Sequence, residues 1–284
     1  MNKLSDIIIS NPEKLERIKK AILQDGAGNF FVLSDFDKTL IKEFTNGKSV
    51  VSLISILRDG NYLTPDYAAK AHALYNKYHA IEIDPNIPSE EKDKMMHKWW
   101  TTHFALLIQS GLNKKDIEKA INSGKAELRE GFNKLADILN RRNIPLVILS
   151  SSGLGIDAIA MYLEKANKLY NNIYIVSNAF EWDKNGNATG VKQPIIHSLN
   201  KTWLSVKNFP FFGKIKNRKN IIILGDSLDD IDMVKGFEYD NLLKIGFLND
   251  NIEKNIELYK KNYDVVILND GSMDYVNEIL ERFK

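Results

Sequence analysis

The stretch from Phe30 to Leu40 reads FFVLSDFDKTL, and it decides the fold. Its first part, Phe30 to Leu33, is a continuous apolar run, which is typical of a strand covered on both faces. Two carboxylates, Asp35 and Asp37, follow at once, and residues two apart in an extended chain point to the same side. The stretch therefore predicts a buried strand that ends in a shared acidic site.

Similar apolar runs recur along the chain, and amphipathic segments separate most of them. We predict strands at residues 29–34, 144–149, 173–176, 221–224, 242–247 and 265–268. We predict helices at 13–23, 132–142, 156–169, 199–206, 230–235, 252–260 and 275–283. Residues 183–187 are rich in turn formers and indicate the tip of a hairpin. Strands alternating with helices predict an α/β fold with a Rossmann-like, doubly wound, mostly parallel sheet.

The segment 44–126 follows a different pattern, without strand-like runs. Its amphipathic stretches indicate helices at 65–78, 89–110 and 114–123. We therefore predict a core domain of residues 1–43 and 127–284, with a helical cap domain of residues 44–126 inserted after the first core strand. The insertion leaves the core at the carboxyl edge of the sheet, where open α/β sheets bind ligands.

Composition excludes several classes of protein. A chain of 284 residues can bury a sizeable core. Its 39 Lys and Arg nearly balance 37 Asp and Glu, so bulk charge favours neither a nucleic-acid polymer nor a membrane as partner. The absence of cysteine excludes disulfides, thiolate zinc sites and a cysteine nucleophile. Without a signal peptide or a run of ~20 apolar residues, we expect a soluble cytoplasmic protein, monomeric or weakly oligomeric.

A second acidic cluster, residues 225–230, also follows an apolar run. Asp226 suits a direct metal ligand, and Asp230 suits a carboxylate that orients a ligand, a water or a lysine. The alternative is that Asp229 and Asp230 cap a helix, just as Asp35 and Asp37 could be a solvated turn. Crowded carboxylates need a cation or a shared proton. Hard oxygen ligands of this kind predict a Mg²⁺ site.

Two further features suit an anion. Residues 150–155 read SSSGLG, follow a predicted strand and open a predicted helix, so that Ser151, Ser152 and free backbone N–H groups offer donors. The alternative is an ordinary serine cap. Lys201 begins a predicted helix and offers a fixed positive charge, although most lysines are solvated surface groups. Each feature is weak by itself.

In chain order, the four elements are the motif at residues 35–40, the serine run at 150–155, Lys201 and the cluster at 225–230. In this order they resemble the haloacid dehalogenase superfamily. The resemblance implies that Asp35 is the nucleophile that becomes an aspartyl-phosphate, and that Asp37 protonates the leaving oxygen and then activates water. It also implies that Mg²⁺ is held by Asp35, the backbone carbonyl of Asp37, and Asp226, with Asp230 in support. The residues that bind the phosphate would be Ser151, Ser152 and Lys201.

Other stretches resemble the cytosolic pyrimidine 5'-nucleotidase type III family. They lie at residues 78–85, 90–92, 99–101, 129–131, 151–155, 196–201 and 244–250. This resemblance implies Mg²⁺-dependent hydrolysis of CMP and UMP, or of 7-methyl-GMP as in some members, to nucleoside and phosphate. Two other functions stay open: a phosphatase for another small phosphomonoester, and a nucleotide-binding protein without turnover.

The family resemblance extends to the side of the site that receives the base. Glu82 matches the family's cap glutamate, whose carboxylate can accept from the amine of cytosine or the N–H groups of guanine. The alternative is a surface acid at a helix end. His103 stands where the family usually has a small residue that reaches the substrate. Trp99 and Trp100 either stack on a base or pack the cap, while residues 50–55 are aliphatic where the family has an aromatic or histidine residue.

Overall fold

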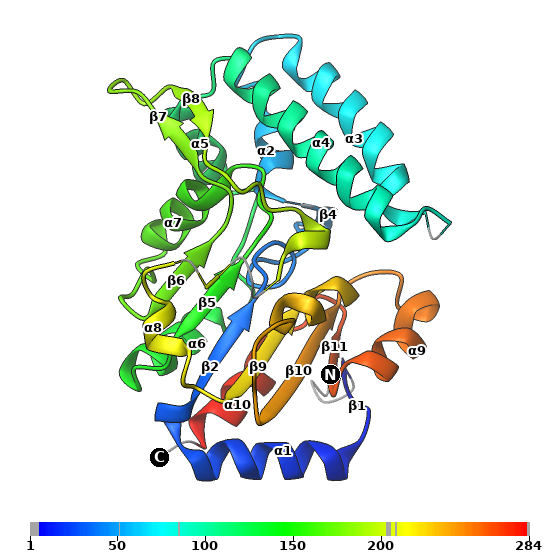
Figure 1. Cartoon of the computed structure of the whole chain (residues 1–284), viewed down its shortest axis with the longest axis vertical. Coiled ribbons are helices and arrows are strands. Elements are labelled where there is room, and N and C mark those ends of the chain that lie inside the picture. The colour runs from blue at the N-terminus through cyan, green and yellow to red at the C-terminus, as the bar shows by residue number, and fades with distance from the viewer. Residues whose placement is uncertain (1–5, 51, 85, 203–205, 208, 283–284) are drawn as a thin grey trace.

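The fold is built on one central sheet (Figure 1). The computed structural model describes residues 6–282 apart from 51, 85, 203–205 and 208. Within these residues, seven strands form the sheet in the order β1-β11-β10-β9-β2-β5-β6. They are β1 (Ile7–Ile9), β2 (Phe30–Ser34), β5 (Leu146–Leu149), β6 (Ile173–Val176), β9 (Asn220–Gly225), β10 (Asn241–Leu248) and β11 (Val265–Leu268). Every pairing is parallel except that of β1 with β11, which confirms the predicted α/β class.

Strand β2 shows why the sheet is covered on both sides. All five of its residues are buried. Phe31 and Leu33 pack on one face among residues of α8 (Phe212–Ile215) and the 3₁₀ helix η5 (Leu228–Val234). Phe30 and Val32 pack on the other face. That second cluster includes, among others, residues of α1 (Pro12–Asp25), α6 (Phe132–Arg141), α7 (Gly155–Lys165) and α10 (Asp274–Glu281). Because alternate residues face opposite layers, a continuous apolar run was the right signature for this strand.

Helix α9 (Ile252–Asn262) packs against β10 and β11.

Local signals set the ends of several helices. Helix α1 begins where the side chain of Asn11 accepts from the backbone N of Lys14 (2.9 Å), with Pro12 in the first turn, and Gly26 ends it. These are ordinary capping choices. They explain why the helix predicted at 13–23 appears almost where the sequence placed it.

Four helices lie between β2 and β5 in sequence and beyond the carboxyl ends of the parallel strands in space (Figure 1). They are α2 (Leu53–Asp59), α3 (Tyr67–Ile83), α4 (Ser89–Gln109) and α5 (Lys114–Asn122). Helices α3 and α4 pack side by side. Their contact includes the stacked rings of Tyr78 and Trp99, whose centroids are 5.9 Å apart. This layer therefore stands over the edge at which the sequence places the acidic residues.

Several elements differ from the prediction. Strand β1 was missed because it is a three-residue edge strand. A small hairpin of β3 (Phe44–Thr45) and β4 (Lys48–Ser49) was missed, as was helix α2. The helix predicted at 199–206 is wrong at its start: residues Ser198–Asn200 form a 3₁₀ turn, η3, and residues 203–205 lie outside the described part of the chain. The predicted hairpin tip is confirmed, between β7 (Phe180–Trp182) and β8 (Ala188–Val191).

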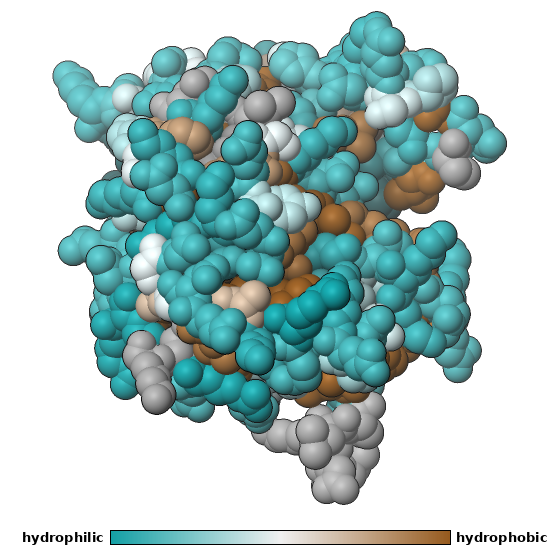
Figure 2. Space-filling view, turned by 60° about the horizontal axis from the view of Figure 1, so that its bottom comes forward, coloured by the Kyte–Doolittle hydropathy of each residue, from teal (hydrophilic) through white to brown (hydrophobic). Residues whose placement is uncertain are grey.

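The surface is largely hydrophilic on the face seen in Figure 2, where hydrophobic residues gather in patches near the middle. In the described part of the chain, no helix has both the length and the apolar character needed to cross a bilayer.

The burial of β2 leads to a stability prediction. Leu33 has no exposed surface, whereas Leu258 on α9 is 49% exposed. Leu33→Ala leaves a cavity in a packed core and should lower the free energy of unfolding by ~2–5 kcal/mol. The matched Leu258→Ala removes little buried surface and should cost less than about 1 kcal/mol. Urea titrations of both variants measure this difference, and equal losses would contradict the assigned burial.

Candidate active site

Three neighbouring strands bring the candidate residues together. Strands β9, β2 and β5 are adjacent in the sheet. Asp35 follows β2, Asp226 follows β9, and the serine run follows β5. The pairing of β2 with β9 continues one residue past the strand, because the backbone N of Asp35 donates to the carbonyl of Leu224 (3.0 Å). The sheet itself therefore fixes where Asp35 stands relative to the acidic loop after β9.

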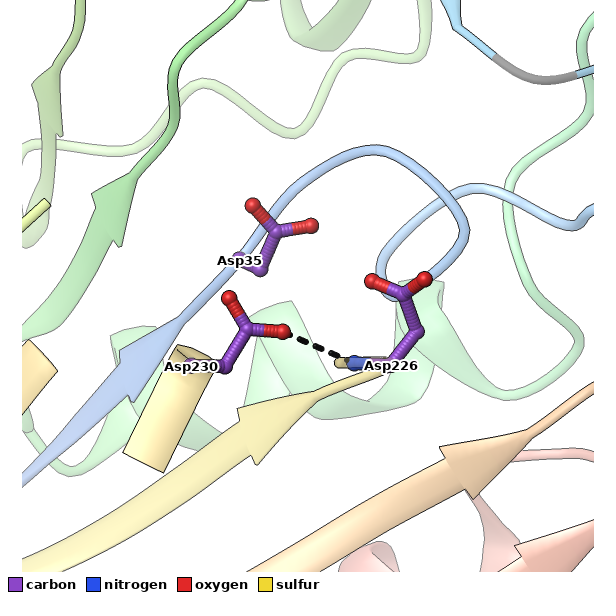
Figure 3. Close-up of side chains that lie close together, drawn as sticks. All are labelled: Asp35, Asp226 and Asp230. Atoms are coloured by element: carbon purple, nitrogen blue, oxygen red, sulfur yellow. Dashed lines mark hydrogen bonds between the residues drawn. The ribbon is translucent and has the colours of Figure 1, made fainter. Parts of the chain in front are cut away.

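Three carboxylates meet at this edge (Figure 3). One oxygen of each of Asp35, Asp226 and Asp230 lies within 4.8 Å of those of the other two. Asp35 and Asp230 are buried, and Asp226 is half-buried. Asp230 organises its own loop: its Oδ2 accepts from the backbone N of Asp226 and of Ser227, both at 3.0 Å. Asp230 therefore acts on Asp226 through the backbone, as a carboxylate that orients a ligand should.

Lys201 joins this group from the loop after η3. Its side chain is 6% exposed, and its Nζ donates to Asp35 and to Oδ1 of Asp230, the latter at 2.7 Å. Burial by itself lowers the pKa of an ammonium group, but the two carboxylates outweigh burial and raise the pKa of Lys201. The lysine is therefore a fixed positive charge rather than a solvated surface group.

The carboxylates carry perturbed pKa values. Loss of water on burial raises the pKa of Asp35 to about 6, with Asp230 adding repulsion, although Lys201 acts in the opposite direction. Burial and the charge of Asp35 raise the pKa of Asp37 to about 7. Burial, Asp230 and Asp35 also raise the pKa of Asp226 well above its ordinary value. Added positive charge would stabilise the ionised form of these carboxylates. Their hard oxygen donors therefore fit a divalent cation such as Mg²⁺.

Asp37 is placed differently from the group of three. Its Oδ1 accepts from the backbone N of Leu53 (3.3 Å), the first residue of α2. Asp35 and Asp37 line the same cavity, as their spacing predicts. The carboxylate of Asp37 is not part of the group of three carboxylates, found among the described residues, that could hold a metal ion. Thr39, in the same turn, donates from Oγ1 to Oδ1 of Asp226 (3.4 Å).

The serine run forms a tight turn at the start of α7. The Oγ of Ser150 accepts from the backbone N of Ser152 (3.2 Å), and the Oγ of Ser152 accepts from the backbone N of Leu154 (3.3 Å). Gly155 has φ +70°, and a Cβ there would lie 2.3 Å from the carbonyl oxygen of Asn178, so glycine is required. Ser151 and Ser152 both line the cavity that contains Asp35.

This cavity has a volume of about 290 Å³ and runs from the carboxylates to the helical layer. Glu82 and Trp100 line its far side, together with Ser198. Trp99 packs instead between the rings of Tyr78 and Trp100. The predicted phosphate-side and base-side residues thus share one cavity, with the exceptions of Trp99 and His103.

His103 is buried within the helical layer. It is 5% exposed, and its Nε2 lies 3.3 Å from the hydroxyl of Tyr67. Its ring centroid is 5.9 Å from that of Trp100, which does line the cavity. In the described structure the cavity lining does not include His103. A direct contact between His103 and a substrate therefore stays a prediction.

Two residues that hold the site were not predicted. Arg129 is 1% exposed and donates from Nε to the carbonyl of Thr39 (2.6 Å), with an ion pair to Asp270 (3.1 Å). Asn178 donates to the carbonyls of Ser152 (3.2 Å) and Ile196 (2.9 Å). Residues 129–131 are among the stretches that resemble the family, but nothing in them assigned a role to Arg129. Asn178 follows the strand at 173–176, and its strand-end position was a usable signal.

The sheet order and the acidic residues at its carboxyl edge define the class: an α/β phosphatase of the haloacid dehalogenase fold. The phosphoserine phosphatase in its substrate-bound complex has this fold too, with a TM-score of 0.53 at 18% identity, over 90% of this chain and 98% of the other. The sequence profile of the family described as "Pyrimidine 5'-nucleotidase (UMPH-1)" matches residues 38–284. The chain belongs to this family, and it is a 5'-nucleotidase, a phosphoric monoester hydrolase.

Two family members give the measure of the similarity. The 7-methylguanosine phosphate-specific 5'-nucleotidase of Gallus gallus is 36% identical over 277 residues, which cover 97% of this chain and 95% of that protein. The crystal structure of cytosolic 5'-nucleotidase IIIB bound to cytidine superposes with a TM-score of 0.86 at 30% identity. That match covers 98% of this chain and 93% of the other.

The buried histidine leads to a prediction about pH. Burial, with repulsion from Arg58, lowers the pKa of His103 to about 4, whereas an unfolded histidine has a pKa of ~6.5. Between these values the unfolded chain binds more protons. The stability contributed by neutral His103 is therefore complete above about pH 6.5 and is lost as the pH falls toward about 4.

In the unmodified protein, the free energy of unfolding should fall as the pH is lowered from about 8 to about 5. In His103→Gln this fall should be smaller by roughly 2 kcal/mol. His72, whose side chain is 48% exposed, provides the control, and His72→Gln should change the pH dependence less than His103→Gln does. Urea titrations at the two pH values decide this. Identical pH dependence in both variants would show that His103 is not held neutral.

Proposed function

We propose that this protein hydrolyses nucleoside 5'-monophosphates with Mg²⁺ as cofactor, and that Asp35 is the nucleophile. One observation carries the proposal: Asp35, Lys201 and Glu82 line the same cavity, whose volume is about 290 Å³. Such a cavity can accept a phosphate beside the nucleophile and a base beside an acceptor carboxylate. Membership of the 5'-nucleotidase family supports the same assignment.

The reaction then has two steps at phosphorus. In the first, Asp35 forms a bond to phosphorus while the bond to the nucleoside 5'-oxygen breaks, and Asp37 gives that oxygen a proton. In the second, Asp37 takes a proton from water as the water oxygen attacks phosphorus. Phosphate leaves, and the carboxylate of Asp35 is restored. Both carboxylates line the cavity, so both can reach the same phosphoryl group.

Charge is the main obstacle to these steps, since an anionic nucleophile must approach an anionic phosphate. Asp35, Asp226 and the backbone carbonyl of Asp37 would hold Mg²⁺, with Asp230 orienting the loop. The ion supplies positive charge next to the transferring oxygens. The groups that would bind those oxygens are Ser151, Ser152 and Lys201. Lys201 is held by Asp35 and Asp230 before the substrate arrives.

For the base, we propose that Glu82 is the acceptor and that Trp100 offers the stacking surface. His103 would act on the base indirectly, through its contact with Trp100. Its direct contact with the substrate stays a prediction. CMP, UMP and 7-methyl-GMP are the candidate substrates, since relatives are named for 7-methylguanosine phosphate or bind cytidine. We also propose that residues 44–126 form a cap domain on a core of residues 1–43 and 127–284, in a monomeric or weakly oligomeric cytoplasmic protein.

A substrate panel tests the proposal. Purified protein with Mg²⁺ is offered CMP, UMP, 7-methyl-GMP, AMP and sugar phosphates, and phosphate release is measured. We expect a preference for one of the first three, loss of activity on chelation of the metal, and collapse of turnover by at least about 10³-fold in Asp35→Asn. A clear preference for a sugar phosphate would overturn the nucleotidase assignment.

The role of Asp37 leads to a second prediction. Asp37→Asn keeps an oxygen that can accept from Leu53, so the start of α2 should stay in place. An amide can neither give nor take the required proton, and kcat should fall by about 10²–10⁴-fold with little change in substrate affinity. Steady-state kinetics and a direct binding measurement separate the two quantities. An unaltered kcat would remove Asp37 from the proton transfers.

A further inference from the structure

Glu82 is held in one orientation before any substrate is present. It lies near the end of α3, with 26% of its side chain exposed. Its Oε1 accepts from the hydroxyl of Ser198 (2.7 Å), and its Oε2 lies 3.1 Å from Nδ1 of His79, one turn earlier in the same helix. Its backbone carbonyl accepts from Nζ of Lys92 (2.9 Å). A flexible glutamate is thereby fixed at both carboxylate oxygens and at its backbone.

Ser198 belongs to a loop that is anchored to the sheet. The side chain of Asn178 makes two bonds to Ile196, accepting from its N (2.8 Å) and donating to its carbonyl (2.9 Å). The backbone N of His197 donates to Oδ1 of Asn200 (2.8 Å), whose Nδ2 donates to the carbonyl of Ile195 (2.9 Å). The loop is therefore braced on both sides of Ser198.

The same loop ends at Lys201, which donates to Asp35 and Asp230. Only two residues, Leu199 and Asn200, thus separate Ser198, which touches Glu82, from Lys201, which bonds to Asp35. We infer that Ser198 is a specificity-determining positioning residue: its hydroxyl sets the orientation in which Glu82 meets the base, and it ties that orientation to the phosphate-binding lysine. This inference rests on the proposed function, in which Glu82 receives the base.

The chemistry favours this role over a simple link between the two layers. A carboxylate has about four acceptor positions, so each oxygen of Glu82 keeps capacity for a base N–H after bonding to Ser198 or His79. Fixing the carboxylate beforehand removes the entropy that a free glutamate side chain would lose on binding. It also makes discrimination sharper, because a base that offers no donor would leave a fixed acceptor unpaired.

A double-mutant cycle tests the inference. KM and kcat are measured for the preferred nucleotide of the panel and for p-nitrophenyl phosphate, which has no base. In Ser198→Ala we expect KM for the nucleotide to rise about tenfold relative to KM for the aryl phosphate. Ser198→Thr keeps a hydroxyl and should restore most of the difference. In a Glu82→Ala background, adding Ser198→Ala should change the nucleotide KM by less than about twofold, because the shared interaction is already lost.

The matched control is Thr102→Ala on α4, whose hydroxyl bonds to the carbonyl of Lys98 within the same helix (2.8 Å) and faces solvent. It should leave both substrates unchanged. Equal rises in KM for both substrates in Ser198→Ala would show a structural link and overturn the inference, as would additive losses in the double variant. If the unmodified protein releases phosphate from none of the nucleotides, the proposed function falls and the inference with it, which is a distinguishable outcome.

Discussion

The repulsion between buried carboxylates at one sheet edge is the constraint on which the rest of the site depends. Asp35, Asp226 and Asp230 hold oxygens within 4.8 Å of one another. At an effective dielectric of about 20, a pair of unit charges at this separation repel by ~3 kcal/mol. The chain answers this repulsion with the buried ammonium of Lys201, which bonds to two of the three. Burial raises the pKa values of Asp35 and Asp226, repulsion within the group adds to this, and the single charge of Lys201 does not cancel the two effects.

Because of this repulsion, buried polar side chains are needed to hold the loops around the site in place. Arg129 donates to the carbonyl of Thr39 and so holds the turn after Asp37. Asn178 bonds to both Ser152 and Ile196 and so joins the serine turn to the loop of Lys201. Buried polar groups of this kind are stabilising only when each finds its partners. The loops can therefore hold charges in place while the sheet supplies the rigid base.

The fold and the residues near the phosphate were predictable because their causes are local. Fully buried strands read as continuous apolar runs, and the acidic and serine residues stand directly after those runs. The order of the strands in the sheet was not predicted, because the runs themselves do not show which strands pair. Lys201 was found by the same resemblance, although the predicted helix at 199–206 does not begin as expected. A lone lysine in the sequence carries no sign of its two carboxylate partners, which lie 166 and 29 residues away.

Other features were not predictable, because they depend on contacts between distant residues. Strand β1 exists through its pairing with β11, about 260 residues later, and three residues leave no periodicity to detect. His103 shows the converse: its residue type and position suggested a contact with the substrate, yet tertiary packing pairs it with Tyr67 behind Trp100. The sequence does not show this packing, and a direct contact of His103 with a substrate stays a prediction.

The helical layer and the sheet meet through residues of the site itself. Asp37 accepts from the backbone N of Leu53 at the start of α2, and Glu82 near the end of α3 accepts from Ser198. Both bonds join an acidic side chain to a polar group of the other layer, and both acids line the cavity. A movement of the layer would therefore displace Asp37's hydrogen-bond partner and the orientation of Glu82 together. In the proposed function, selection of the base by Glu82 and proton transfer by Asp37 would in this way be coupled through the position of the helical layer.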